Sequence, residues 1–207
     1  MDVAIINYGM NNLYSVKNAC NRFGLISKIT NNHEEIMNSK VAILPGVGAF
    51  AQAMQILKEK KLNKTILDFI QTGKPFFGIC LGMQLLFTES NEFGLTEGLN
   101  LIKGKVVKFS SVNYKIPIPQ IGWNKIFFYK NEFTNTVLKD NKNEDFMYFV
   151  HSYHVIPEEK NVQLTYTKYF DINYCSSIKK ENITAFQFHP EKSGINGNKV
   201  FQSIKSS

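Results

Sequence analysis

The chain has 207 residues, 43% of them hydrophobic and 13% aromatic, and its formal net charge is +7. A chain of this length buries about 70% of the surface that its unfolded form exposes, so a single domain over residues 1–207 needs no disulfide or metal ion to fold. The 17 Phe and 9 Tyr exclude intrinsic disorder, because so apolar a chain does not stay unfolded in water.

The three cysteines, Cys20, Cys80 and Cys175, are odd in number and lie far apart. This spacing argues against the disulfide framework of a secreted protein and against a cysteine-based metal site. The N-terminus lacks the basic region of a signal peptide. The longest uncharged apolar run, Pro75–Phe87, is too short to span a bilayer. We therefore expect a cytoplasmic protein with no metal site.

The positive charge comes almost entirely from lysine, since Arg22 is the one arginine. Proteins that bind nucleic acids usually cluster their basic residues and rely on arginine for bidentate contacts. Here the lysines are scattered, apart from a group at Lys58, Lys60, Lys61 and Lys64 on one expected helix face. The charge is better explained by a compositional bias towards lysine than by a nucleic-acid partner.

The first half of the chain alternates short apolar runs with segments in which apolar residues recur every three or four positions. The runs are typical of buried strands, and the recurring pattern is typical of amphipathic helices. Repeated units of this kind imply parallel strands in one sheet that is covered on both faces. In chain order we predict a strand over Val3–Asn7, a helix carrying Leu13, Val16, Ala19, Cys20 and Phe23, strands over Ile26–Thr30 and Val41–Leu44, helices over Ala49–Lys60 and Leu62–Gln71, a strand over Pro75–Ile79 and the start of a helix over Leu81–Phe87.

The second half is richer in strands and closes with a short helix. No linker or repeat separates it from the first half, so we predict one α/β domain. Its fold class is a three-layer, open, mostly parallel sheet with helices on both faces and antiparallel strands added towards the C-terminus. The predicted elements are strands over Leu101–Phe109, Lys125–Tyr129, Phe146–Val150, Val162–Lys168, Tyr174–Ile178 and Thr184–Phe188, and a helix over Gly197–Ile204.

The sharpest local motif is Gly78-Ile79-Cys80-Leu81-Gly82, in which a cysteine stands between an expected strand and an expected helix. A tight strand-to-helix turn holds a nucleophile in a strained conformation, and small flanking residues remove side chains that would collide with it. A helix N-terminus beside the sulfur favours the thiolate, and the Leu81 N–H is a natural oxyanion donor. A buried core cysteine between incidental glycines has the same appearance.

A cysteine nucleophile needs a base, and the chain offers four histidines. His33 lies in a polar stretch and is interpreted as a solvated residue at a helix start. His151 and His154 flank Ser-Tyr at the end of an apolar strand, and as a metal pair they lack a third ligand. His189 follows an apolar strand, at the edge where the active sites of parallel sheets collect, and Glu191 can orient its ring. The sequence therefore offers a nucleophile, a base and an orienting carboxylate.

The cysteine motif, extended to Gln84, and the Gln187–Glu191 segment together resemble the class I (triad) glutamine amidotransferases. More narrowly, the chain resembles the glutaminase subunits of imidazole glycerol phosphate synthases of histidine biosynthesis. This resemblance covers essentially the whole chain, in the right order and at the right length. The segments that carry it are Tyr8–Leu13, Pro45–Phe50, Pro119–Asn124, Tyr148–Tyr153 and Gln187–Ser193.

The resemblance implies a reaction and its residues. Cys80 would attack the side-chain carboxamide of glutamine, His189 would carry the proton to the departing ammonia, and Glu191 would fix the tautomer of the ring. No cofactor is implied. Glu92 also has a plain alternative interpretation, as a carboxylate in a surface loop. The other positions implied are Leu81, Val47 and Gly48 as oxyanion donors, and Gln84, Glu92, Ser152 and Tyr153 as the residues that hold glutamine.

The resemblance also implies a partner, a separate (β/α)8 barrel synthase that receives the ammonia, makes imidazole glycerol phosphate and AICAR, and raises a low basal glutaminase activity when it binds its nucleotide. Trp123 is the one tryptophan, and it suits an interface anchor. A core aromatic residue that caps a strand is the alternative. The positions implied at the heterodimer interface are Asn12, Trp123, Tyr148 and Lys192.

Several positions depart from the usual pattern: Asn11 replaces a glycine, Tyr14 a basic residue and Gln120 a histidine, and the segment Tyr169–Tyr174 lacks a glycine often found there. These departures leave open which molecule accepts the ammonia. In the alternative pathway, the same glutaminase chemistry supplies ammonia to a paralogous barrel partner for surface-sugar amidation. Two other classes share some of these features. A cysteine hydrolase or peptidase would also have the cysteine turn and a histidine, and a basic nucleic-acid-binding module would also have the net charge.

Overall fold

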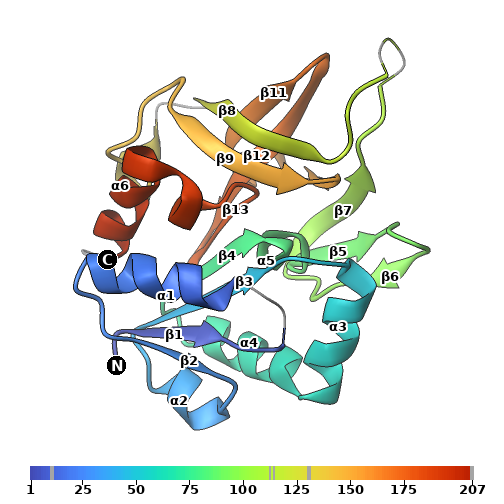
Figure 1. Ribbon diagram of the computed structural model, residues 1–207. Helices are drawn as coiled ribbons and strands as arrows, with labels where there is room; N and C mark the ends of the chain where they lie inside the picture. Colours follow the sequence, from blue (N-terminus) through green and yellow to red (C-terminus); the bar gives the residue numbers. More distant parts are fainter. Residues whose placement is uncertain (10–11, 112, 114, 130–131, 206–207) are drawn as a thin grey trace.

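The computed structural model describes residues 1–9, 12–111, 113, 115–129 and 132–205 (Figure 1). Asn11 therefore lies outside the described residues. The strands are β1 (Val3–Ile6), β2 (Ser27–Thr30), β3 (Val41–Gly46), β4 (Phe76–Cys80), β5 (Phe87–Ser90), β6 (Thr96–Glu97), β7 (Ile102–Lys108), β8 (Gln120–Phe128), β9 (Phe146–His151), β10 (Tyr153–Pro157), β11 (Gln163–Tyr169), β12 (Ile172–Lys180) and β13 (Ile183–Phe186). The α-helices are α1 (Leu13–Arg22), α2 (His33–Met37), α3 (Phe50–Glu59), α4 (Leu62–Gln71), α5 (Leu81–Gln84) and α6 (Gly194–Lys205).

A parallel core, in the order β2-β1-β3-β4-β13, forms one side of the sheet. Strands β12, β10 and β7 continue it through antiparallel pairs, and β5 and β6 complete this path. A second antiparallel branch, formed by β11, β8 and β9, leaves the path at β12. This confirms the predicted fold class, in which antiparallel strands extend a parallel α/β sheet towards the C-terminus.

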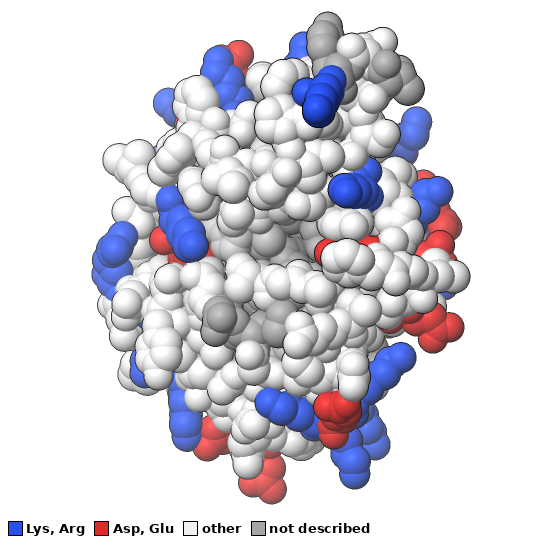
Figure 2. Space-filling view, turned by 45° about the vertical axis from the view of Figure 1, so that its right-hand side comes forward, with Lys and Arg blue, Asp and Glu red and all other residues white. Residues whose placement is uncertain are grey.

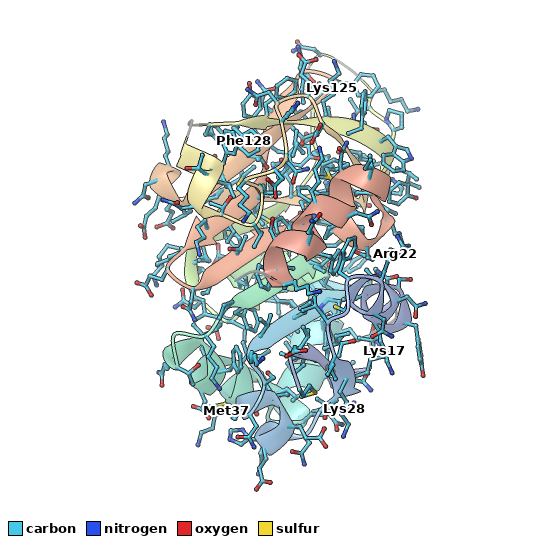
Figure 3. All side chains as sticks on the ribbon, turned by 90° about the vertical axis from the view of Figure 1, so that its left-hand side faces the viewer. Lys17, Arg22, Lys28, Met37, Lys125 and Phe128 are labelled. Carbon is cyan, nitrogen blue, oxygen red and sulfur yellow. The ribbon has the colours of Figure 1, made fainter. Side chains whose placement is uncertain are left out.

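Helices cover both faces of the parallel core (Figure 1). Along β1, Ala4 and Ile6 pack into the cluster that includes α2, α3, α4 and α5, whereas Val3 and Ile5 pack into the cluster that includes α1 and α6. Successive strand residues point to opposite faces, so one strand contributes to both clusters. The one arginine, Arg22, donates from α1 to the side chain of Asn198 on α6 at 3.2 Å, and Figure 3 shows it at the end of α1.

Strand β3 is two residues longer than predicted, because the proline does not end it. Val41 donates its N–H towards β1 and Ala42 donates towards β4, so the residues of β3 alternate between these neighbours. Pro45 is on the β1 side, where pairing ends at Ile43, so its missing N–H breaks no ladder bond. Gly46 pairs with Cys80.

Another difference between the predicted and the observed elements arises in a segment that is buried on all sides. The helix predicted over Leu81–Phe87 ends at Gln84, and Phe87 opens β5. Every residue from 81 to 87 is buried, and a continuous apolar run cannot distinguish a helix from a strand. Strand β10, which the sequence analysis did not predict, begins two residues after β9 ends.

Positive and negative side chains are interspersed around the outline of the face shown in Figure 2, whose hollowed centre is largely uncharged. Lysine is therefore not gathered into one basic patch on this face. Among the described residues, none of the helices has the length and apolar character that crossing a bilayer requires.

We predict that Gly82→Ala destabilises the fold by at least about 2 kcal/mol, measured by chemical denaturation. A Cβ atom at this position would lie 1.8 Å from the carbonyl oxygen of Leu44. Gly73→Ala is the control, because a Cβ there meets nothing within 4 Å and only its positive φ costs about 1 kcal/mol. Equal losses in the two variants would contradict this account.

Candidate active site

The cysteine turn lies at the carboxyl edge of the parallel core, where β3 and β4 end side by side. Cys80 is the last residue of β4, and α5 begins at the next residue. Its backbone has φ 54° and ψ −110°, a region that residues with a side chain rarely occupy. A Cβ at Gly78 would lie 2.9 Å from the carbonyl oxygen of Gly82. The two glycines thus permit the tight turn that holds Cys80 in its strained conformation.

The histidine and the glutamate reach the same edge from the other end of the chain. Strand β13 pairs in parallel with β4, with Phe186 opposite Ile79, so the residues that follow both strands emerge together. His189 is fully buried, and its Nδ1 lies 2.7 Å from Oε1 of Glu191. Its backbone N–H donates to the carbonyl of Tyr148 at 2.9 Å. The ring is therefore fixed both through its backbone and through a carboxylate.

Two opposing effects set the protonation of His189. Burial lowers the pKa of the ring, but the charge of Cys80 and then the hydrogen bond and charge of Glu191 raise it to about 10. Nδ1 faces Glu191, whereas Nε2 is buried without a hydrogen-bond partner among the described residues. Nε2 is thus the ring nitrogen that the carboxylate leaves unengaged.

Cys80 is only 5% exposed, and polar groups surround its sulfur. Gln187 donates its Nε2 to the sulfur at 3.7 Å, and the carbonyl oxygen of Val150 lies 3.9 Å from it. Gln187 also accepts a hydrogen bond from Gln84 at 3.1 Å. Gln187 was not predicted as a site residue, because its side chain reaches the sulfur only through the pairing of β13 with β4.

A cavity of about 250 Å³ opens beside the sulfur. It is lined by the cysteine itself and by all seven residues that the resemblance implied as oxyanion donors or glutamine contacts. It is lined further by Pro119, Val150 and His151, which were not among those implied. The seven are Val47, Gly48, Leu81, Gln84, Glu92, Ser152 and Tyr153.

Glu92 is tied to the start of a helix as well as lining the cavity. Its Oε2 accepts the backbone N–H of Phe50, the first residue of α3, at 2.6 Å. A carboxylate at a helix N-terminus is favourable because the first N–H groups of the helix have no partner within it. The charge of Glu92, after burial, raises the pKa of Tyr153, which is consistent with a carboxylate inside the cavity. Glu92 thus lies in the loop between β5 and β6 and also lines the cavity, with its side chain bound to the start of α3.

The four residues implied at the interface lie in or near the segment that carries His189 and Glu191. Trp123 is 51% exposed and packs edge-on against Tyr148, with ring centroids 5.9 Å apart. Asn12 donates its Nδ2 to Oε1 of Glu191 at 2.5 Å, and Lys192 is exposed. The exposure of Trp123 disfavours its alternative interpretation as a core residue. The contact of Asn12 with the carboxylate was not foreseen.

Gln120, which stands in the place of a usual histidine, is fully buried and donates to the side chain of Asn124 at 2.9 Å. The hydroxyl of Tyr8 is also buried, without a hydrogen-bond partner among the described residues, close to Gly46. Burial and then the charge of Cys80 raise the pKa of this phenol. Tyr8 therefore acts as a neutral side chain beneath the end of β3.

The model of the class-I glutamine amidotransferase family matches residues 4–203, and the chain belongs to this family. It is therefore a glutamine amidotransferase, an enzyme that hydrolyses glutamine.

Two relatives are similar to this chain over nearly their whole length. The imidazole glycerol phosphate synthase subunit HisH of Aquifex aeolicus (strain VF5) is 44% identical over 99% of this chain and 96% of its own. That of Caldanaerobacter subterraneus subsp. tengcongensis is 45% identical over 98% of this chain and 96% of its own.

Solved structures share the fold at low sequence identity. The structure of PurLQS from Thermotoga maritima superimposes with a TM-score of 0.76 at 19% identity, over 99% of this chain and 97% of that one. A crystal structure of a glutamine amidotransferase gives a TM-score of 0.74 at 15% identity, over the full length of both chains.

We predict that Cys80→Ala lowers the pKa of His189 from about 10, because the sulfur is the main contributor that raises it. Titration of the imidazole by NMR measures this shift. Since the folded pKa exceeds the ordinary 6.5, the protonated ring stabilises the fold fully below about pH 6.5, and this stabilisation is lost as the pH rises towards 10. Between about pH 6.5 and 10, the free energy of unfolding of the Cys80→Ala variant should therefore fall less than that of the wild type. An unchanged pKa in the variant would contradict the coupling.

Proposed function

We propose that this chain hydrolyses glutamine to glutamate and ammonia through Cys80, His189 and Glu191, and that residues 1–207 form one domain for this purpose. It would deliver the ammonia to a (β/α)8 barrel subunit that makes imidazole glycerol phosphate and AICAR in histidine biosynthesis. The proposal is supported by the parallel pairing of β4 with β13, which brings Cys80, beside the cavity of about 250 Å³, and the hydrogen-bonded pair of His189 and Glu191 to one edge of the sheet.

In the first half of the reaction, the sulfur of Cys80 attacks the carboxamide carbon of glutamine while its proton resides on Nε2 of His189. The carbonyl oxygen becomes an oxyanion, which the Leu81 N–H and an N–H from Val47 or Gly48 stabilise. Nε2 then protonates the departing nitrogen, the C–N bond breaks, and ammonia leaves. The product on the enzyme is a γ-glutamyl thioester.

In the second half, water replaces ammonia. His189 takes a proton from the water, the hydroxyl oxygen bonds to the thioester carbon, and the C–S bond breaks to release glutamate. Glu191 keeps Nδ1 engaged throughout, so Nε2 remains the atom that exchanges protons. The raised pKa of His189 suits a ring that stores the thiol proton before it is transferred.

The cavity suits the amino-acid end of glutamine, which carries an ammonium and a carboxylate. Glu92 supplies a negative charge for the ammonium. The backbone of Ser152 and Tyr153 offers hydrogen bonds to the carboxylate, and Gln84 supports this backbone by donating to the carbonyl of Tyr153 at 2.9 Å.

The names of the relatives favour the histidine pathway over sugar amidation, since both are imidazole glycerol phosphate synthase subunits. An exposed surface next to the site suits a partner. Trp123 and Tyr148 present an aromatic pair there, and exposed tryptophans are typical interface anchors. A partner on this side would receive ammonia close to where it forms, before water protonates it.

We predict that Cys80→Ala and Cys80→Ser each reduce glutamate release from glutamine by at least about 10³-fold, with thermal melting showing an intact fold. Cys20→Ala is the matched control. Burial raises the pKa of the Cys20 thiol to about 12, so it remains protonated and should not contribute. A glutamine-derived affinity reagent should label Cys80, whereas cysteine-protease peptide probes should not.

Turnover that survives loss of Cys80 would overturn the proposed chemistry. Labelling by peptide probes in place of the glutamine analogue would favour the peptidase class instead.

We predict that Trp123→Ala raises the dissociation constant for the barrel synthase at least about tenfold, measured by calorimetry with the co-expressed partner. Ile26→Ala is the control, because Ile26 is exposed and precedes β2 at the opposite edge of the sheet. Equal binding by wild type and the Trp123 variant would place the partner elsewhere.

A further inference from the structure

One buried titratable residue of the cavity has no role in the proton transfers proposed above. His151 ends β9, is 7% exposed and lines the cavity beside Cys80. Aromatic rings enclose it, with Phe109 at 5.2 Å and Tyr174 at 5.4 Å between ring centroids. Its imidazole therefore lies directly behind the segment in which Ser152 and Tyr153 line the same cavity.

The protonation and tautomer of this ring follow from its surroundings. Burial, aided by the charges of His154 and His189 and opposed by the hydrogen bond to the Tyr153 backbone, lowers the pKa of His151 to about 3, so the ring is neutral. Nδ1 lies 2.8 Å from the carbonyl oxygen of Tyr153, which can only accept, so Nδ1 carries the hydrogen. Nε2, 3.3 Å from the hydroxyl of Tyr174, must then accept from that hydroxyl.

The ring is one of two donors that hold a single carbonyl. The Tyr153 oxygen accepts from Nδ1 of His151 and from Nε2 of Gln84 at 2.9 Å. On the other side of the chain, the carbonyl of Ser152 accepts the N–H of Phe109 at 3.1 Å. The peptide groups at this bend between β9 and β10 are thus held from both sides.

This arrangement turns Tyr153 towards the cavity. In an antiparallel pair, directly hydrogen-bonded positions alternate with positions whose polar groups point away from the partner strand. Because Phe109 bonds to Ser152, the next pair, Tyr153 and Lys108, is of the second kind. The N–H of Tyr153 therefore points to the same side as its carbonyl, where Gln84 and His151 line the cavity.

We propose that His151 is a positioning residue for glutamine binding, which, together with Gln84, holds the carbonyl of Tyr153 and so orients the Ser152–Tyr153 backbone that receives the amino-acid end of the substrate. This inference rests on the proposed glutaminase function. In this role the neutral ring of His151 donates a hydrogen bond from Nδ1 and does not change its charge.

His154 provides a matched control within the same fold. It too is buried, with a pKa that burial lowers to about 4, and it stacks on Phe109 with ring centroids 4.8 Å apart. Its Nδ1 lies 3.3 Å from the carbonyl of Val155, and it does not line the cavity. A purely structural need for a buried imidazole would apply to both residues.

The test compares two amide substitutions of His151, which place a hydrogen-bond donor where different nitrogens of the imidazole lie. The side-chain nitrogen of asparagine can occupy the place of Nδ1, and that of glutamine the place of Nε2. We expect His151→Asn to keep the KM for glutamine within about threefold of wild type, and His151→Gln to raise it about tenfold or more. The kcat should stay within about threefold in both variants, and His154→Asn and His154→Gln should leave both constants unchanged.

The possible outcomes distinguish a failure of the role proposed for His151 from a failure of the proposed glutaminase function. If the wild-type chain, with its barrel partner, releases no glutamate from glutamine, the glutaminase proposal fails and this inference fails with it. If the wild type turns over but the Asn and Gln variants share one KM, only the role of His151 is overturned. Should the Gln variant lack the wild-type thermal transition, His151→Ala takes its place, with the same rise in KM expected and an unchanged KM contradicting the proposal.

Discussion

The site depends on a close backbone approach at the end of β4. The carbonyl oxygen of Leu44 occupies the space where any side chain at residue 82 would lie, so α5 can begin against β3 only with glycine there. That approach lets the chain turn from strand to helix at one residue, Cys80, whose positive φ directs the sulfur out of the sheet. The strain in this turn is supported by the buried pairing of β3 with β4, as expected where a fold holds a functional residue in an unfavourable conformation.

The second requirement is a cysteine and a histidine brought together from distant parts of the chain. Because β13 lies beside β4 in parallel, the residues after each strand meet at one edge, and His189 emerges next to the sulfur. Charges interact more strongly in a buried site than in water, which is why the charge of Cys80 raises the pKa of His189 against the effect of burial. Asn12, from the start of α1, donates to the carboxylate behind the ring and so links a third distant segment to the pair.

Local patterns predicted the parts of the site that short segments encode. The glycines around Cys80 and the spacing of His189 and Glu191 were visible because each depends on neighbours in sequence. The donation from Asn12 to Glu191 spans 179 residues and has no local signature, so it was not predicted. His151 was considered only as half of a metal pair, because its neutral state depends on Phe109 and Tyr174, which reach it from other strands.

The central claim, that the sulfur at this turn becomes acylated by glutamine, can be observed directly. Turnover with glutamine would be quenched in acid within milliseconds, and the chain digested and analysed by mass spectrometry. The account predicts one γ-glutamyl group on the peptide that contains Cys80, labile to hydroxylamine as a thioester is. A γ-glutamyl group on any other residue would contradict the account, as would glutamate formation at full rate with no acyl-enzyme at any quench time.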